Sequence, residues 1–330
     1  MLQRSRLSPE VYASLERALE GQSLTLDQAR PLTGVLGPEL LALQAVADEL
    51  RQRQVGERVT YVINRNINFT NVCIKHCGFC AFSRDLRTEE GYHLSDGEIL
   101  RRVQEAVDYG ATEVCIQAGL PPKMAGDLYI QLTRKVKESF PQLHLHAFSP
   151  EEVLYGSIRS RCSIQEYLQE LKQAGLDSLP GTSAEILIQE LRDQVAPGRI
   201  TVAQWQEVIR SAHQLGLPTT STMMFGFVEQ PEDWLTHMQL LRDIQVETGG
   251  FTEFVPLGFV HGEAPMYKNG QVKVRAGASG LEVMRVHALA RLFLGNHIPN
   301  LQASWVKEGV KLAQLLLQAG VNDLGGTLIN

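Results

Sequence analysis

From about residue 60 onward, the chain alternates between short extended segments and helical stretches. The extended segments that we predict are 59–70, 113–117, 143–148, 178–181, 219–225, 252–257, 301–304 and 323–327. The helical stretches that we predict between them include 95–109, 125–139, 163–174, 201–215, 231–247, 279–295 and 305–318. Strands that alternate with helices favour a parallel sheet. Eight such units would close into an α/β fold of the (β/α)8 TIM-barrel type; a six-unit partial barrel with two appended units is the alternative.

Glycines and one capping pattern support these boundaries. Gly110 and Gly175 each follow a predicted helix and precede a strand, where a left-handed C-cap favours glycine. Ser95, followed three residues later by Glu98, is a capping-box pattern. We therefore expect helices that end just before the next strand begins.

The first 55 residues are predicted to be helical but to lie outside this alternation. Segments 9–20 and 38–54 carry apolar residues at three- and four-residue spacing. Pro9 and Pro38 suit the first turn of a helix. We therefore expect an N-terminal helical extension over 1–55, which plugs one end of the barrel or covers one side, and a barrel domain over 56–330.

Composition limits the class of protein. Hydrophobic residues make up 44% of the chain and charged residues 21%, which is enough for a sizeable core. The net charge of −6 argues against general binding to nucleic acid or anionic membranes. The first twenty residues mix charges without the apolar core of a signal peptide, and no run approaches about 18 apolar residues. We expect a cytoplasmic protein whose five cysteines are ligands or core residues, not disulfides.

The strongest chemical signal is a C-x3-C-x2-C spacing formed by Cys73, Cys77 and Cys80. It follows a predicted strand, where a barrel places its active site. Thiolates are preferred ligands of iron–sulfur clusters and of zinc. Three cysteines would bind three irons of a [4Fe–4S] cluster and leave the fourth for another ligand. A zinc site with His76 as fourth ligand is the alternative; the two other cysteines are expected to be structural.

The cysteine motif, followed by a small-residue turn at Gln117-Ala118-Gly119, resembles the radical S-adenosylmethionine (SAM) superfamily. Within it, the chain resembles FO synthase subunit 2, the tyrosine 4-hydroxyphenyl transferase family of deazaflavin biosynthesis, over roughly residues 55–330. The segments that carry this resemblance are NRNINFTNVC, CGFCAFSR, LHLHAFSPEEV, PGTSAEIL, TTSTMMFGFVE, GGFTEFVPLGFVH, ASWVKEG and GVNDLGGTL. Two radical SAM enzymes of futalosine-dependent menaquinone synthesis are similar and are the alternative. Ala118 departs from the pattern, because a second glycine is expected there.

The resemblance implies a [4Fe–4S] cluster on Cys73, Cys77 and Cys80, whose free iron chelates SAM. An electron from an external donor would then cleave SAM to a 5′-deoxyadenosyl radical. The implied substrates are L-tyrosine, which loses its 4-hydroxybenzyl group, and 5-amino-6-(D-ribitylamino)uracil, which receives it. FO synthase subunit 1 is the implied functional partner. A zinc- or Fe–S-stabilised barrel without radical chemistry is the alternative from another class.

Residues at predicted strand ends are the candidates for SAM contacts, since barrel active sites lie there. Gln117 is placed to orient the SAM amino group, Gly119 allows a close backbone approach, and Arg199 suits a carboxylate. The competing roles are an ordinary turn, a helix cap and a solvated cation. The predicted cofactor-binding residues are Phe79, Gln117, Gly119, Ser149, Glu185, Arg199 and Gly226.

A second set of polar residues at strand ends is expected to contact the substrates. Buried polar groups need partners, which ribityl hydroxyls, uracil edges or tyrosine would supply. The competing roles are helix capping and, for His146, a satisfied core histidine. The predicted substrate residues are His146, Thr222, Glu253, Gln302, Trp305, Asn322 and Asp323. The sequence assigns no catalytic side chain.

Overall fold

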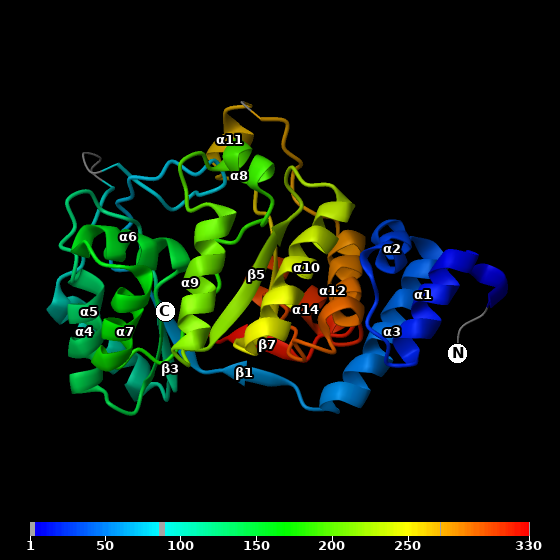
Figure 1. The fold of residues 1–330 in the computed structure, drawn as a ribbon, viewed down its shortest axis with the longest axis horizontal. Helices are drawn as coiled ribbons and strands as arrows, with labels where there is room; N and C mark the ends of the chain where they lie inside the picture. The colour runs from blue at the N-terminus through cyan, green and yellow to red at the C-terminus, as the bar shows by residue number, and fades with distance from the viewer. Residues whose placement is uncertain (1–3, 86–89, 271, 330) are drawn as a thin grey trace.

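The computed structural model describes residues 4–85, 90–270 and 272–329, and most of the predicted extended segments form short strands (Figure 1). The strands are β1 (Thr60–Val62), β2 (Asn64–Ile67), β3 (Glu113–Ile116), β4 (His144–Ala147), β5 (Thr219–Phe225), β6 (Phe251–Gly258) and β7 (Asp323–Gly326). The predicted strands 178–181 and 301–304 shrink to single bridges, at 178–179 and 301–302. In the first case Pro180 ends the pairing, because it has no N–H to donate.

Every strand pair is parallel. Strands β2, β3 and β4 form one sheet, in which Asn64, Glu113 and His144 lie side by side. Strand β5 pairs with β6, and β1 pairs with β7. Parallel bridges join His146 to Ser178, Leu179 to Thr219, Phe254 to Leu301, and Gln302 to Asp323. The chain therefore has a mixed α/β fold, in which neighbouring strands follow the order of the sequence.

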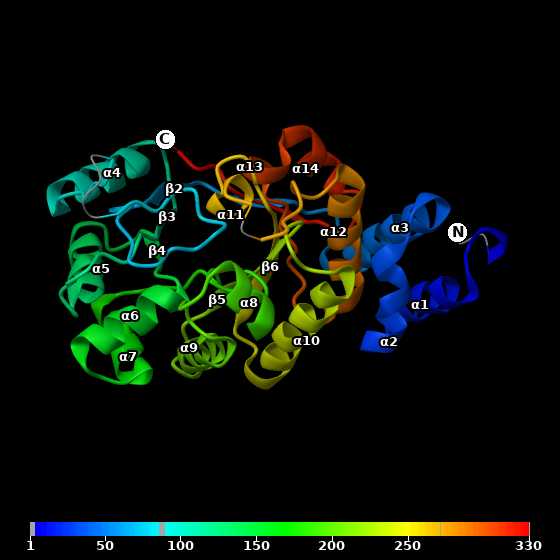
Figure 2. The ribbon, with the colours of Figure 1, turned by 90° about the horizontal axis from the view of Figure 1, so that it is seen from above.

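Helices lie on the outside of these strands (Figure 2). They are α4 (Asp96–Asp108), α5 (Leu128–Ser139), α6 (Pro150–Ser160), α7 (Ile164–Ala174), α8 (Gln189–Val195), α9 (Val202–Gln214), α10 (Pro231–Thr248), α11 (Pro265–Lys268), α12 (Gly280–Leu294), α13 (Trp305–Glu308) and α14 (Val310–Leu316). Helices α6, α8 and α11 were not predicted. The single helix predicted over 305–318 is broken at Gly309, whose φ of 78° is not helical.

Helix ends follow the local sequence signals, with one correction. Gly175 is the C-cap of α7, at a φ of 106°. The side chain of Ser95 accepts the backbone N–H of Glu98 at 3.3 Å. The capping box predicted there is only half formed, because the Glu98 carboxylate turns outward to Arg101 and Arg102.

The N-terminal helices lie beside α10 and α12 in both ribbon views, so they cover a side and not an end of the strands (Figures 1 and 2). They are η1 (Arg4–Arg6), α1 (Pro9–Leu19), α2 (Leu26–Ala29), η2 (Arg30–Gly34) and α3 (Gly37–Val55). Helix α3 packs on α12, and Arg242 of α10 donates to the Leu24 carbonyl at 2.8 Å.

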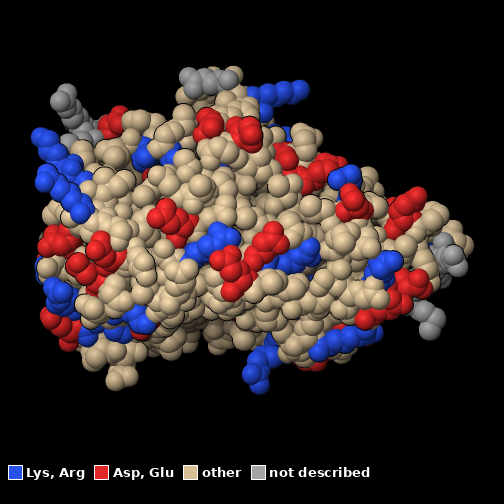
Figure 3. Space-filling model, viewed as in Figure 1, with Lys and Arg blue, Asp and Glu red and all other residues tan. Residues whose placement is uncertain are grey.

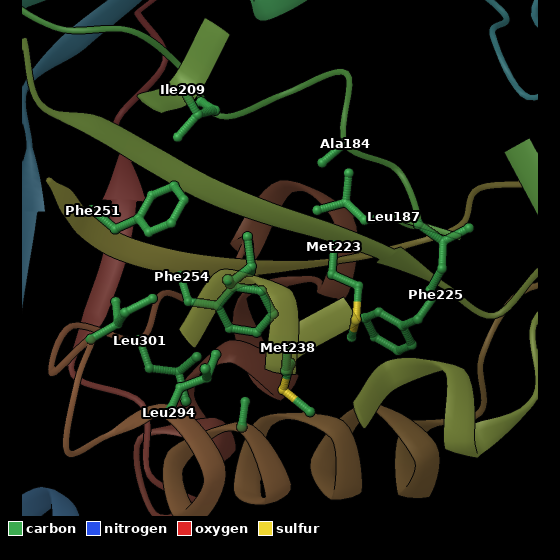
Figure 4. Packing of buried hydrophobic residues seen from close by; sticks show 14 of the residues in the cluster. Ala184, Leu187, Ile209, Met223, Phe225, Met238, Phe251, Phe254, Leu294 and Leu301 are labelled. Atoms are coloured by element: carbon green, nitrogen blue, oxygen red, sulfur yellow. The ribbon is translucent and has the colours of Figure 1, made fainter. Parts of the chain in front are cut away.

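The core lies between the outer faces of the strands and the helices. Figure 4 shows Met223 of β5 and Phe254 of β6 packing towards Met238 of α10 and Leu294 of α12. Because side chains alternate along a strand, burying Met223 outward turns its neighbour Thr222 to the inner side. Within the described ranges, no helix is long and apolar enough to cross a membrane.

Gly156 tests the packing of α6 on α7. An alanine Cβ there would lie 2.5 Å from Cε1 of Tyr167, whose hydroxyl is held by the Gly126 carbonyl. We expect Gly156→Ala to lower the free energy of unfolding by about 1–3 kcal/mol, because overpacking outweighs alanine's better helix propensity. Chemical denaturation measures this. Gly97→Ala in α4 is the control, since its Cβ would meet just Ser95 Oγ, at 4.0 Å; equal effects of the two changes would contradict the packing.

Candidate functional site

The cysteine loop follows β2 and lies near α8 and α11 (Figure 1). Backbone hydrogen bonds fix it: Ile74 N donates to Leu120 O at 2.9 Å and Gly78 N donates to Val195 O at 2.8 Å. A Cβ on Gly78 would lie 2.9 Å from the Met266 Cβ. The glycine between Cys77 and Cys80 is therefore required by close packing on α11.

The three cysteines line two clefts. The outer one, of about 410 Å³, is lined by all three cysteines together with Arg84 and Lys268. The inner one, of about 120 Å³, is lined by the same cysteines and by residues from the ends of neighbouring strands. These inner residues include Gly119, Ser149, Glu151, Glu152 and Arg199. The thiols thus have one side towards the surface and another towards a polar pocket.

A buried ion-pair network adjoins Cys77. The Arg199 guanidinium lies 3.6 Å from the Cys77 Sγ, 2.8 Å from Glu185 and 3.1 Å from Glu151. Burial alone would lower the pKa of Arg199, but these neighbours outweigh it and the pKa is raised. Burial raises the pKa of the Cys77 thiol to about 12, against the opposing effect of Arg199. Cys77 would therefore need further positive charge, such as a metal centre, to ionise.

The spacing of the thiols bears on which metal centre fits. A tetrahedral zinc ion would bring its thiolates within about 3.8 Å of one another. Among the described residues, the three cysteines do not form a group whose ligand atoms all lie within 4.8 Å. Three more widely spaced thiols fit a larger iron–sulfur cluster better than one zinc ion. His76, the fourth zinc ligand of the alternative, is exposed and lies 4.0 Å from Asp85.

The turn after β3 packs directly on the cysteine loop. Gly119 N donates to Thr70 O at 2.9 Å, and a Cβ on Gly119 would lie 2.8 Å from the Val72 carbonyl carbon. The Ala118 N–H donates to Glu152 at 2.9 Å. The same carboxylate accepts from the backbone and the hydroxyl of Ser149, at 2.7 and 2.6 Å. Through these hydrogen bonds the Glu152 carboxyl links two strand ends at the inner cleft. Burial raises the pKa of this carboxyl to about 7.

The other predicted cofactor residues, Phe79, Gln117 and Gly226, are not among the described residues that line the inner cleft. Phe79 lies with its ring 5.7 Å from the Arg199 guanidinium. Gln117 lines a central cavity, where its side-chain oxygen accepts from Thr182 at 2.7 Å. Gly226 is not among the described residues that line either cleft at the cysteines. Its N–H donates to Glu229 at 2.6 Å, and a Cβ there would meet Ala278 N at 2.6 Å.

A cavity of about 420 Å³, here called the lumen, lies on the inner side of the strands. Five of the seven predicted substrate residues line it: His146, Thr222, Glu253, Gln302 and Asp323. Asn322 points the opposite way and accepts a hydrogen bond from Arg291 at 2.7 Å. Trp305 instead lines an apolar groove beside Tyr61, and its indole N–H donates to the Gly326 carbonyl.

The lumen is acidic. Glu113, Glu253 and Asp323 line it, and none of its lining residues, all within the described ranges, is lysine or arginine. Burial, then the charges of Asp323 and Glu113, raise the pKa of Glu253 to about 8. Burial also raises the pKa of Glu113. On the outer face seen in Figure 3, by contrast, acidic and basic side chains are interspersed.

Two imidazoles share one hydroxyl in the lumen. Ser178 Oγ lies 2.7 Å from His144 Nε2 and 2.7 Å from His146 Nδ1. Burial lowers the pKa of His146 to about 3, so it is neutral. Ligand atoms of Glu113, His144 and His146 all lie within 4.8 Å, which makes them a candidate metal group. The serine hydroxyl already accounts for how both rings are oriented.

Sequence reasoning missed several residues of these sites. Glu151 and Glu152 lie in the first turn of α6, which was not predicted and which begins at Pro150. Lys75, 3.4 Å from Glu151, looks like a loop cation. Glu113 did carry a signal, because it is the one charged residue of the strand EVCI.

Comparisons with known proteins agree with this geometry. The model of the radical SAM superfamily matches residues 67–241, and the model described as the CofH/MqnC C-terminal region matches 248–330. The 5-amino-6-(D-ribitylamino)uracil–L-tyrosine 4-hydroxyphenyl transferase of Methanopyrus kandleri is 51% identical over 90% of this chain and 80% of its own. The FO synthase of Streptomyces coelicolor is 47% identical over 98% of this chain, which spans 37% of that protein.

The fold is similar to that of a solved structure, methylornithine synthase (PylB). The TM-score is 0.74 at 20% identity, over 96% of this chain and 86% of the other. At that identity the likeness concerns the fold alone. By its sequence matches, the chain belongs to the radical SAM superfamily and, within it, to the family of 5-amino-6-(D-ribitylamino)uracil–L-tyrosine 4-hydroxyphenyl transferases.

Proposed function

We propose that the chain transfers the 4-hydroxybenzyl group of L-tyrosine to 5-amino-6-(D-ribitylamino)uracil, a step in the formation of the deazaflavin FO. The observation that carries the proposal is the 51% identity with the Methanopyrus kandleri transferase over 90% of the chain. The arrangement of three cysteines, an inner cleft and a polar lumen supports it, since the reaction needs a metal centre, a cofactor site and room for two substrates.

The cysteines and the inner cleft would hold the cofactors. A [4Fe–4S] cluster on Cys73, Cys77 and Cys80 with bound SAM would supply the 5′-deoxyadenosyl radical that starts the reaction. Arg199 would balance negative charge at Cys77 and the SAM carboxylate. Gly119 lines the cleft, and its lack of a side chain lets this turn pack against the Val72–Cys73 backbone. Ser149 would line the cleft beside Glu152, to which its hydroxyl donates.

The lumen would receive the substrates on the inner side of the strands. A carbon radical abstracts hydrogen from many groups, so the side chains around the lumen must orient the substrates and limit access of solvent. His146, Thr222, Glu253, Gln302 and Asp323 would do this for tyrosine and the uracil. Asn322 and Trp305 would support the neighbouring strands instead.

We also propose that the strands close into a (β/α)8 barrel over 56–330, with 1–55 as an extension. Support comes from the bridges between successive strands and from the pairing of β7 with β1. An external electron donor would approach through the outer cleft at the cysteines. FO synthase subunit 1 would close the ring of the product; the much greater length of the matching FO synthases agrees with a separate second activity.

The test is anaerobic incubation of the reconstituted protein with SAM, a reductant, tyrosine and the ribitylaminouracil. We expect a hydroxybenzyl–uracil adduct together with deoxyadenosine, detected by mass spectrometry. Deoxyadenosine without the adduct would exclude these substrates while leaving the superfamily chemistry intact. Futalosine-type substrates offered in parallel should give no product.

Replacement of one cysteine tests the metal centre. We expect Cys77→Ala to lose iron and acid-labile sulfide after reconstitution, and to lower deoxyadenosine formation to background, because a three-cysteine cluster site lacks a spare ligand. Cys162→Ala is the matched control, since Cys162 lies outside both clefts and the lumen. Wild-type protein with one zinc and no sulfide would contradict the cluster assignment.

The turn at Ala118 and Gly119 offers a second pair of substitutions, one expected to impair SAM cleavage and the other serving as its control. We expect Gly119→Ala to lower SAM cleavage by about tenfold or more, because its Cβ would displace the Val72–Cys73 backbone. Ala118→Gly should leave SAM cleavage within about twofold, because its contact to Glu152 uses the backbone N–H. Deoxyadenosine formation at saturating reductant measures both. Equal effects would contradict the role of the close contact.

Glu253 should make stability depend on pH. Its pKa rises from 4.5 to about 8 on folding. The folded chain therefore keeps this proton between about pH 5 and 8 while the unfolded chain has released it, so the residue costs stability as the pH rises through that window. We expect ligand-free Glu253→Gln to melt a few degrees above wild type at pH 8 and close to wild type at pH 5. An equal gain at both pH values would contradict the shift.

A further inference from the structure

Resting on the proposed function, we propose that the acidic end of the lumen, formed by Glu113, Glu253, Gln302 and Asp323, is the subsite of the ribityl chain. It takes a neutral polyol and rejects the corresponding phosphate ester. The uracil ring would then lie towards the cysteines and the ribityl chain would extend away from them.

The position of these residues along the strands supports this orientation. Glu113 is the first residue of β3 and Asp323 the first residue of β7. Gln117 follows the other end of β3 and adjoins the turn that packs on the cysteine loop. Gln117 lies four residues along the chain from Glu113, a rise of about 13 Å for an extended strand. The acidic end therefore lies far from the cysteines, at a depth that suits a long ligand with its reactive ring at one end.

At the acidic end, unused hydrogen-bonding capacity lies on Glu253 and Gln302. The Asp323 carboxylate already accepts from the Thr60 hydroxyl and the Gly325 N–H, and Glu113 accepts from the Asn64 amide. Gln302 Nε2 lies 3.4 Å from Glu253 Oε2 and 3.4 Å from Asp323 Oδ1, which are long contacts. Within the described residues, the second carboxylate oxygen of Glu253 has no hydrogen-bond donor. Neighbouring hydroxyls of a polyol donate to carboxylates and accept from an amide N–H. The aromatic ring of tyrosine offers a single hydroxyl, so it satisfies fewer of these groups than a polyol does.

Charge explains why a phosphate ester would be excluded. The lumen carries three carboxyl groups and, among its described lining residues, no lysine or arginine. A phosphate dianion brought here would lose water and meet carboxylates without a compensating cation. Neutral hydroxyls carry no such penalty. The reaction that supplies this substrate must therefore deliver it without a phosphate group.

The decisive experiment is calorimetric titration of the cluster-containing protein without SAM, so that no turnover occurs. The ligands are 5-amino-6-(D-ribitylamino)uracil, its 5′-phosphate, and 5,6-diaminouracil, which lacks the chain. We expect the ribityl compound to bind at least about tenfold more tightly than either other ligand, since diaminouracil lacks the hydroxyls that hydrogen-bond here and the phosphate meets carboxyl groups without a cation. Equal affinity for the ribityl compound and diaminouracil would overturn the subsite, and this result needs no variant.

Glu253→Gln sharpens the test. We expect it to weaken binding of the ribityl compound about tenfold, to leave diaminouracil within about threefold, and to narrow the discrimination against the phosphate. Glu247→Gln makes the same substitution on the exposed side of α10, where Glu247 pairs with Arg210, and should change none of the three affinities. An unchanged affinity profile in Glu253→Gln would overturn the proposal.

Three further outcomes separate this inference from others. Binding of the ribityl compound that appears only after Zn²⁺ or Mn²⁺ is added would overturn direct recognition, and would point to a metal on Glu113, His144 and His146. Selective binding of the ribityl compound without formation of the hydroxybenzyl adduct would support the subsite and refute the proposed transfer. Adduct formation without selectivity for the chain would do the reverse.

Discussion

The parallel register of β2, β3 and β4 is the constraint on which both sites depend. It aligns Asn64 with Glu113 and His144, and, two residues later, Asn66 with Cys115 and His146. Because side chains alternate, these layers face the lumen while the residues between them face the helices. The same register brings the ends of β2 and β3 together, so the cysteine loop after β2 meets the turn after β3. A shift by one residue would empty the lumen of its polar groups and separate the two turns.

Charge divides the two sites more sharply than shape does. Near the cysteines, Arg199 and Lys75 lie against Glu151, so that carboxylates and cations balance around a pocket that would hold a charged cofactor. The lumen has carboxylates without cations. Because burial and the neighbouring carboxylates raise its pKa to about 8, Glu253 keeps its proton near neutral pH and can donate a hydrogen bond. The site at the cysteines, where cations and carboxylates balance, therefore suits an ionic ligand. The lumen, which has no lysine or arginine among its described lining residues, suits neutral hydrogen-bonding groups.

Local signals in the sequence were sufficient for some features and insufficient for others. The cysteine spacing and the glycine at 119 could be recognised because backbone geometry and ligand number act over a few residues. Thr222 was expected at the substrates and does line the lumen, although the polarity of TTSTMMF alone does not separate its two faces, because residues of both are compatible with burial. Asn322 and Asp323 were both expected to meet substrate, but adjacent strand residues face opposite sides. Glu152 escaped notice because its capping box to Ser149 hides its contact with Ala118, 34 residues away.

That contact also shows how an alanine is accommodated at position 118, where a glycine was expected. Glu152 uses the backbone N–H of Ala118, so a methyl group on Cα leaves the hydrogen bond intact. At Gly119 the backbone of Val72 occupies the space that a methyl group would need. The alanine therefore stands at the position where the backbone does the binding, and glycine remains where two backbones touch. The glycine at 119 therefore serves the packing of the cysteine loop, since the atoms that a Cβ would meet belong to Val72 and Cys73.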